Sequence, residues 1–219
     1  MTGRLEQLAR RRRAVAPPAP AAPAAPAGGT QVGEAPNQRC ELCAVPIGAE
    51  HPHLLDTTTG GLRCACRACA LVLGQPAAGG GRYRLVPERR VELPDLARDD
   101  ARWRDLGLPV SLAFLVRRGD AVTAIFPGAL GPTDAPVAPE AWAALEAAEP
   151  AVRALEPEVE ALLVNRMRGD RECWIAPIDL CYRLVALVRT QWTGLTGGDE
   201  VWTEIDRFFG ELIRSEATR

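Results

Sequence analysis

The pattern of apolar and polar positions after about residue 91 predicts an α+β domain. Residues 111–116 and 121–126 are both rich in strand-forming side chains, and the triplet Arg-Gly-Asp at 118–120 supplies a turn between them. These segments predict an antiparallel β-hairpin. Before the domain, residues 83–86 predict one further strand.

A second hairpin is predicted between residues 159–164 and 173–176, with its turn at 168–170. A helix over residues 158–167 is the competing interpretation, because Glu, Ala and Leu are also good helix formers. We favour the hairpin, but the sequence pattern does not exclude the helix.

Three helices are predicted in the second half of the chain. Residues 139–148 form the first, with Trp142 and Leu145 on one side. The second and third begin near Asp179 and Asp199, which we expect to cap them. Apolar residues repeat at helical spacing in both, at Leu180, Leu184, Leu187, Val188 and Trp192, and at Trp202, Ile205, Phe209 and Leu212. We expect these side chains to lie in the core or at an interface.

The start of the chain is expected to stay outside the folded part. Residues 1–12 suit a short helix, but residues 14–29 are almost entirely Ala and Pro and end in Gly-Gly. Such a composition forms a semi-extended tether and no apolar core. The predicted parts of the chain are a tail (1–37), a cysteine-rich segment (38–80) and an α+β domain (81–219).

Two Cys-x-x-Cys pairs predict a metal site. Cys40 and Cys43 form the first pair, Cys66 and Cys69 form the second, and an alanine after each pair allows a tight backbone turn. Four deprotonated thiols suit the tetrahedral coordination that zinc and iron both favour. The spacing between the pairs is slightly longer than is common in zinc ribbons. We therefore predict a small zinc-ribbon or rubredoxin-like module that holds one zinc ion, with iron as the alternative.

Further candidate ligands lie close to these pairs. Cys64 either lies beside the metal without binding it or replaces one of the four cysteines. His53 is another candidate ligand, although hydrogen bonding within a loop is the more common role of such a histidine. His51 and His53 flank Pro52, so we do not expect both to face one metal. The remaining cysteines, in an apolar region, are expected to be small buried residues: Cys173 and Cys181.

Composition narrows the classes of function. The 26 basic residues are all arginine, which excludes chemistry that needs a lysine, such as Schiff-base formation. The net charge of −2 gives no general attraction to nucleic acid or anionic lipid. An odd number of cysteines, five of them within residues 40–69, argues against a secreted disulfide framework. Because neither a signal peptide nor a membrane span is apparent, we expect a cytoplasmic protein.

A site closed by four thiolates has no open position for water or substrate, which argues against hydrolytic zinc chemistry. Motifs typical of metalloproteases, serine hydrolases and nucleotide-binding enzymes are absent from the sequence. Arg39, Arg63 and Arg67 flank the cysteines, and either offset the thiolate charge or are ordinary surface residues. We expect a protein that is not an enzyme.

Several segments after residue 38 carry a resemblance to a known family. They are Cys40-Glu-Leu-Cys43, His53-Leu-Leu-Asp56, Cys64-Ala-Cys66-Arg-Ala-Cys69-Ala70, and residues 80–87, 159–166, 177–182 and 197–202. In these segments the chain resembles an uncharacterised family encoded in gene clusters for high-affinity uptake nickel–iron hydrogenases. The resemblance implies a cytoplasmic accessory factor for assembly, maturation or service of the hydrogenase. Rubredoxin-like accessory proteins accompany oxygen-tolerant uptake hydrogenases, and a site with two cysteine pairs fits that role by analogy.

These observations lead to a ranked set of functions. The favoured one is a binding module, in which a structural zinc organises the cysteine-rich segment and the α+β domain docks a protein partner, such as a hydrogenase subunit. An iron electron carrier using the same sulfurs is the alternative. The long spacing weakens it, as does the lack of a proline after Cys66, where rubredoxins usually carry one. A nucleic-acid-binding zinc ribbon is disfavoured by the net charge and by the lack of aromatic residues around the cysteines. An enzyme of unrecognised type is the remaining function class, and it is also disfavoured.

Overall fold

The computed structural model describes residues 38–75, 80–194 and 196–216. These residues belong to one compact unit. The helix predicted over residues 1–12 and the Ala/Pro segment after it lie outside the described residues. The α+β class predicted from the sequence is confirmed.

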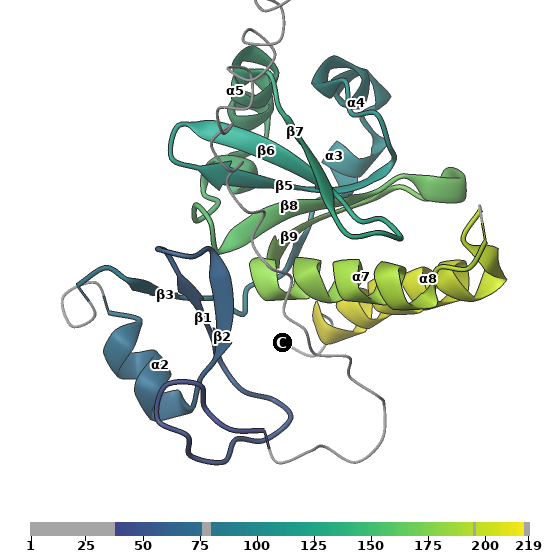
Figure 1. Cartoon of the computed structure of the whole chain (residues 1–219). Helices are drawn as coiled ribbons and strands as arrows, with labels where there is room; N and C mark the ends of the chain where they lie inside the picture. Colours follow the sequence, from purple (N-terminus) through teal and green to yellow (C-terminus); the bar gives the residue numbers. More distant parts are fainter. Residues whose placement is uncertain (1–37, 76–79, 195, 217–219) are drawn as a thin grey trace, which may run out of the picture. The chain divides into compact units, whose positions relative to one another are not determined.

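A small antiparallel sheet follows the first cysteine pair (Figure 1). Its strands, in the order β2-β1-β3, and the helix that follows β2 are β1 (His53–Asp56), β2 (Gly61–Cys64), β3 (Tyr83–Leu85) and α2 (Arg67–Leu73). Leu54, Ala65 and Ala70 form the buried centre of this part. We call residues 38–75 together with β3 the cysteine-rich module.

A larger antiparallel sheet forms the centre of the rest of the chain. In sheet order its strands are β4 (Val91–Glu92), β9 (Glu172–Pro177), β8 (Glu160–Asn165), β5 (Leu112–Arg118), β6 (Ala121–Phe126) and β7 (Thr133–Pro136). A single 3-10 turn, η1 (Met167–Gly169), lies between β8 and β9. We call residues 91–216 the sheet domain.

Helices cover both faces of this sheet (Figure 1). One face packs against α7 (Ile178–Gln191) and α8 (Gly198–Glu216); the other packs against α3 (Pro94–Arg98), α4 (Asp100–Leu106), α5 (Pro139–Ala148) and α6 (Pro150–Arg153). All six residues of β8 are buried, and adjacent side chains point to opposite faces. Leu163 packs beneath α7 and α8, whereas Leu162 packs on the other side. The sheet domain is therefore three layers thick.

The structure confirms the two predicted hairpins. The first is β5–β6, in which Arg118 pairs with Ala121 across the turn. The second is β8–β9, so the alternative helix over residues 158–167 is wrong. Hydrogen bonding of β8 to β5 on one side and β9 on the other overrides the helix propensity of its Glu, Ala and Leu residues. The helix predicted over 139–148 has the same bounds as α5.

Two predicted helix caps are corrected. The residue that precedes α7 is Pro177, and Asp179 lies inside the first turn. The Asp179 carboxylate instead accepts hydrogen bonds from its neighbour Leu180 N and from His53 Nδ1. Likewise α8 begins at Gly198, so Asp199 lies in its first turn, where a negative charge still suits the helix dipole.

The strand predicted at residues 83–86 exists as β3, but it pairs with β1 of the cysteine-rich module. Sheet hydrogen bonds therefore cross the predicted boundary between residues 80 and 81. Arg84 on β3 also donates from Nη1 to Pro157 O at 2.7 Å, which joins the module to the loop before β8. Leu55 and Val86 belong to the same buried cluster as Trp174 of β9.

A buried carboxylate on β8 has one arginine partner. Glu160 is 1% exposed and accepts bonds of 2.8 and 2.6 Å from Nε and Nη2 of Arg89, whose side chain is 40% exposed. Glu156 N–H donates to the same carboxylate at 2.9 Å. Removal of the guanidinium would leave the Glu160 charge buried with the Glu156 N–H as its remaining partner.

We expect Arg89→Met to lower the free energy of unfolding by about 2 kcal/mol, measured by urea denaturation, because a buried charged acceptor loses two hydrogen bonds. The matched control is Arg98→Met, which removes an exposed i,i+3 pair with Asp95 and should cost less than about 0.5 kcal/mol. Equal effects of the two substitutions would show that the buried pair adds nothing.

Candidate metal centre

The first cysteine pair forms a tight knuckle. Cys40 N–H donates to Val45 O, and Ala44 N–H donates to Cys40 O, each at 2.8 Å. Ala44 has a φ of 61°, in the left-handed region that disfavours large side chains. The small residue predicted after the pair is therefore required by the turn.

The second pair lies at the start of a helix rather than in a second knuckle. Cys66 is the N-cap of α2, and its Sγ accepts a hydrogen bond from Cys69 N–H at 3.4 Å. Ala70 lies in the first turn of α2 and packs into the small apolar centre. The small residue after this pair is therefore needed for packing and not for a left-handed turn.

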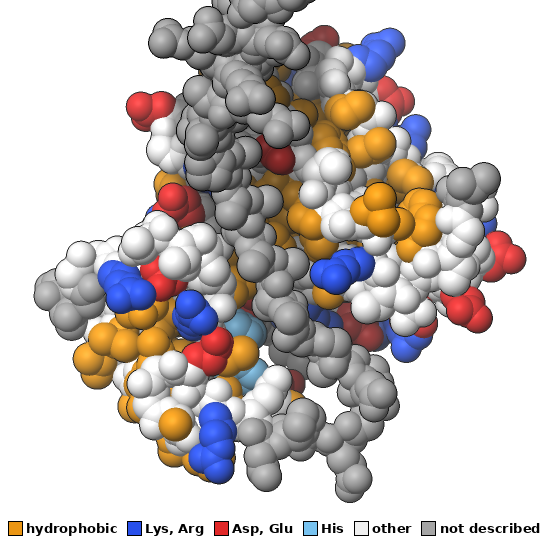
Figure 2. All heavy atoms as spheres, in the orientation of Figure 1, with side chains coloured by type: hydrophobic (Ala, Val, Ile, Leu, Met, Phe, Trp, Pro, Cys, Tyr) orange, Lys and Arg blue, Asp and Glu red, His pale blue; other side chains and the backbone are white. Residues whose placement is uncertain are grey.

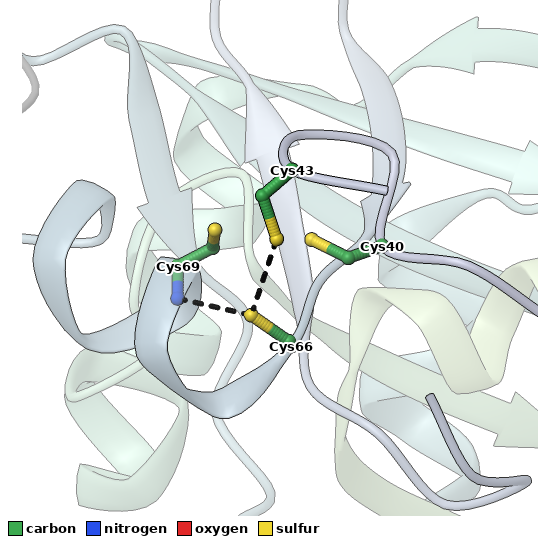
Figure 3. A group of neighbouring side chains, drawn as sticks. All are labelled: Cys40, Cys43, Cys66 and Cys69. Atoms are coloured by element: carbon green, nitrogen blue, oxygen red, sulfur yellow. Dashed lines mark hydrogen bonds between the residues drawn. The ribbon is translucent and has the colours of Figure 1, made fainter. Parts of the chain in front are cut away.

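The four thiols converge (Figure 3). All four Sγ atoms lie within 4.8 Å of one another, and those of Cys43 and Cys66 are 3.7 Å apart. A tetrahedron with metal–sulfur bonds of about 2.3 Å has sulfur–sulfur edges of about 3.8 Å. None of the four is in a disulfide. The group of Cys40, Cys43, Cys66 and Cys69 could hold one metal ion.

The ionisation of these thiols is unequal. Burial opposes ionisation of Cys40, but hydrogen bonds from backbone N–H groups of Cys66, Leu42 and Cys43 outweigh it and lower its pKa to about 6. Hydrogen bonding to Cys43 and burial together raise the pKa of Cys69 to about 12. Without a cation, one thiolate suppresses ionisation of its neighbours. A divalent ion among the sulfurs would remove that repulsion.

A family model described as a family of unknown function (DUF5947) matches residues 39–216. The chain belongs to this family. The DUF5947 match begins one residue before Cys40 and ends in α8, so it contains both cysteine pairs and the sheet domain. No match was found among curated proteins or among solved structures. Of the helices in the described part of this DUF5947 chain, none has the length and apolar character needed to cross a membrane.

Cys64 and His53, the other candidate ligands in this DUF5947 member, form a separate group with His51. Pairing of β1 with β2 puts His53 directly opposite Cys64, away from the four converging thiols. Although they flank Pro52, His51 and His53 lie close together, with ring centroids 4.8 Å apart. Sequence reasoning named Cys64 and His53 only as further ligands for the metal of the cysteine pairs, because their meeting with each other depends on the register of β1 and β2.

His53 also contacts α7 of the sheet domain. Its Nδ1 donates to Asp179 Oδ2 at 2.9 Å. Hydrogen bonds to Asp179 and to Cys64 raise the pKa of His53 to about 9, against the effect of burial. The carboxylate therefore holds a proton on Nδ1 and orients the ring.

Two of the flanking arginines have partners other than the thiolates. Arg63 pairs with Glu41 at 3.2 Å, and Arg39 donates to Ala44 O of the knuckle at 3.0 Å. Glu41 in turn accepts from Cys64 N–H at 2.6 Å, which joins the knuckle to β2. These contacts brace the knuckle and hold it against β2.

The last two cysteines are as expected. Cys173 and Cys181 are fully buried in the sheet domain, and burial raises the pKa of both thiols. A thiol held neutral in this way is neither a metal ligand nor a nucleophile.

We expect Cys40→Ser or Cys69→Ser to lose the metal ion of the four-cysteine group and to unfold or aggregate the module. Cys64→Ser should keep that ion, because its thiol belongs to the other group. Elemental analysis of purified protein measures metal per chain. Complete loss of metal in Cys64→Ser would contradict this assignment of ligands.

Proposed function

We propose that this protein is a non-catalytic, metal-binding accessory protein, in which a structural zinc ion at the four cysteines organises a module for docking a protein partner. One observation carries the proposal: four free thiols converge at the geometry of a tetrahedral site in a module with little apolar core of its own. Among the described residues, its fully buried centre is Leu54 with two alanines, and Leu42, Leu73 and Tyr83 pack against it while partly exposed. Metal binding would therefore contribute much of the free energy that folds the module.

The docking role is supported by apolar side chains exposed on the same module. Leu71 and Val72 on α2 are both 58% exposed, and Leu85 on β3 is 40% exposed. Figure 2 shows hydrophobic side chains gathered over the part of the module that carries α2. Such residues are costly to leave in water unless a partner covers them.

The partner that we propose is a subunit of a cytoplasmic nickel–iron hydrogenase. This part of the proposal rests on the sequence resemblance around the cysteine pairs and in the sheet domain. An accessory role in assembly or maturation needs no open metal position, which agrees with a site closed by four thiolates.

An iron electron carrier is the second candidate, and the position of Cys43 favours it. This ligand is exposed, so a metal at the four cysteines would lie close to the surface, as electron transfer requires. The helical start at Cys66 and the arginine that follows it differ from the Cys-Pro knuckle usual in rubredoxins. Zinc therefore remains the favoured metal.

The two candidates differ in a direct measurement. Protein purified under reducing conditions without added metal should contain zinc at the four cysteines and show no visible absorption. Iron with thiolate-to-iron absorption that bleaches on reduction would favour the electron carrier. Zinc can displace iron during overexpression, so native-level expression is the appropriate source.

Docking is tested by co-expression with the hydrogenase subunits and purification of the complex. We expect the wild type to form a complex with a subunit and the Leu71→Arg/Val72→Arg variant to lose it, with metal content unchanged. The control is Leu130→Arg, at an exposed leucine in the loop between β6 and β7 of the sheet domain. No complex with any hydrogenase subunit, or equal loss in both variants, would contradict the proposal.

A further inference from the structure

The group formed by His51, His53 and Cys64 has the features of a second metal site. One ligand atom from each residue lies within 4.8 Å of the others, and none of the three belongs to the four-cysteine group. Imidazole nitrogen and thiolate sulfur together suit zinc-like transition-metal ions and not magnesium or calcium. The group therefore has both the donor types and the spacing of a metal site.

Hydrogen bonds fix both histidine rings in the way that metal-binding histidines require. His51 Nδ1 lies 2.8 Å from Gly48 O, and a carbonyl oxygen only accepts, so this nitrogen carries the proton. His53 Nδ1 donates to the Asp179 carboxylate at 2.9 Å. Metal-ligating histidines almost always donate their other ring N–H to a carboxylate or backbone carbonyl. Nε2 is then the ring nitrogen that each histidine can offer to a metal, and for His53 this means giving up its hydrogen bond to Cys64.

One of these nitrogens lacks a partner. His51 Nε2 is buried and makes no hydrogen bond to any residue in the described part of the chain. A buried polar atom without a hydrogen-bond partner destabilises the folded state. Native proteins seldom retain such an atom unless it has a structural or functional role. A metal ion bound at Nε2 would supply the missing partner.

The backbone brings the three ligands together from two directions. His53 and Cys64 are directly opposite residues in the β1–β2 pair, which places their side chains on the same face of the small sheet. Ala65 N–H donates to Pro52 O at 3.0 Å, which holds the chain between the two histidines against the end of β2. Strand pairing and this backbone hydrogen bond therefore hold the three candidate ligands in place.

Both histidines also line a cavity of about 280 Å³ between the module and α7. Three protein ligands leave one position of a tetrahedral ion unfilled, and catalytic or exchanging zinc sites have that composition. The cavity would give a water molecule or a small ligand access to the fourth position.

From these contacts we propose that His51, His53 and Cys64 bind a second divalent transition-metal ion, through Nε2, Nε2 and Sγ, with an open fourth position. When the ion binds, the proton held between the Cys64 thiol and the His53 ring is released to solvent, which frees Sγ and Nε2 as ligands. This site is separate from the structural site at the four cysteines and does not depend on the identity of the docking partner.

Cobalt(II) is the probe for this site. The purified protein, with the metal at its four cysteines first counted, is incubated with Co²⁺ and freed of unbound metal by desalting. We expect one cobalt per chain in addition to the original metal, with a thiolate-to-cobalt charge-transfer band. Cobalt that replaces the original metal would lower the first count, so displacement is distinguishable from uptake at a second site.

Variants assign the ligands. Cys64→Ser and His51→Ala/His53→Ala should each lose the additional cobalt while keeping the metal at the four cysteines. Cys173→Ala is the matched control, because it removes a thiol that belongs to neither group and should leave cobalt uptake unchanged. Absence of additional cobalt in the wild type, or uptake and a charge-transfer band that survive in Cys64→Ser, would overturn the proposal.

A milder variant tests the site even if a ligand variant fails to fold. Asp179→Asn keeps the shape of the side chain but weakens its hold on His53 Nδ1, and should lower the affinity for cobalt by about 10–100-fold in a titration. The control is Asp95→Asn, at a fully exposed carboxylate of α3. Unchanged affinity in Asp179→Asn would show that His53, which Asp179 holds, is not a ligand, and would overturn the proposed ligand set.

Discussion

Four cysteine thiols lie within 4.8 Å of one another, at the junction of a knuckle and a helix start. Hydrogen bonding to Cys43 and burial raise the pKa of Cys69, and the charge of the Cys40 thiolate adds repulsion to this. The fold of the module brings these groups together even though its own apolar centre is small. A cation at the four sulfurs would convert the repulsion into attraction, and under the proposed function the rest of the module depends on this interaction.

Strand β1 connects the four-cysteine module to the sheet domain through its packing contacts. Its adjacent residues point to opposite faces: Leu54 packs in the centre of the module, whereas Leu55 packs in the cluster shared with Trp174 of β9. His53, on the same strand, contacts Asp179 of α7. Loss of order at the cysteines would therefore also disturb the contact of β1 with the sheet domain and the position of His53.

Much of the architecture could be predicted from local sequence. The two hairpins and α5 follow from strand formers, turn residues and apolar spacing. The cysteine pairs identify, without any structure, the four residues that could hold a metal ion. The strand assignment of β8 was ambiguous because its residues suit both states, and pairing on both edges decides it. Short or polar elements, such as β1, β2 and α4, have too little periodicity to be recognised.

The group around His53 could not be predicted, because its members meet through strand register and a contact between distant segments. Asp179 is a second example. Its position near a helix start predicts a capping role, yet its carboxylate pairs with a histidine from another part of the chain. Local rules assign a role to each side chain from its neighbours in sequence, and non-local hydrogen bonds override that role.

Whether a metal at the four cysteines holds the module together can be measured by hydrogen–deuterium exchange before and after removal of the metal with a chelator. We expect amides of β1, β2 and α2 to lose protection, while those of β5 and β8 in the centre of the larger sheet keep theirs. Unchanged protection of the module in metal-free protein would contradict it.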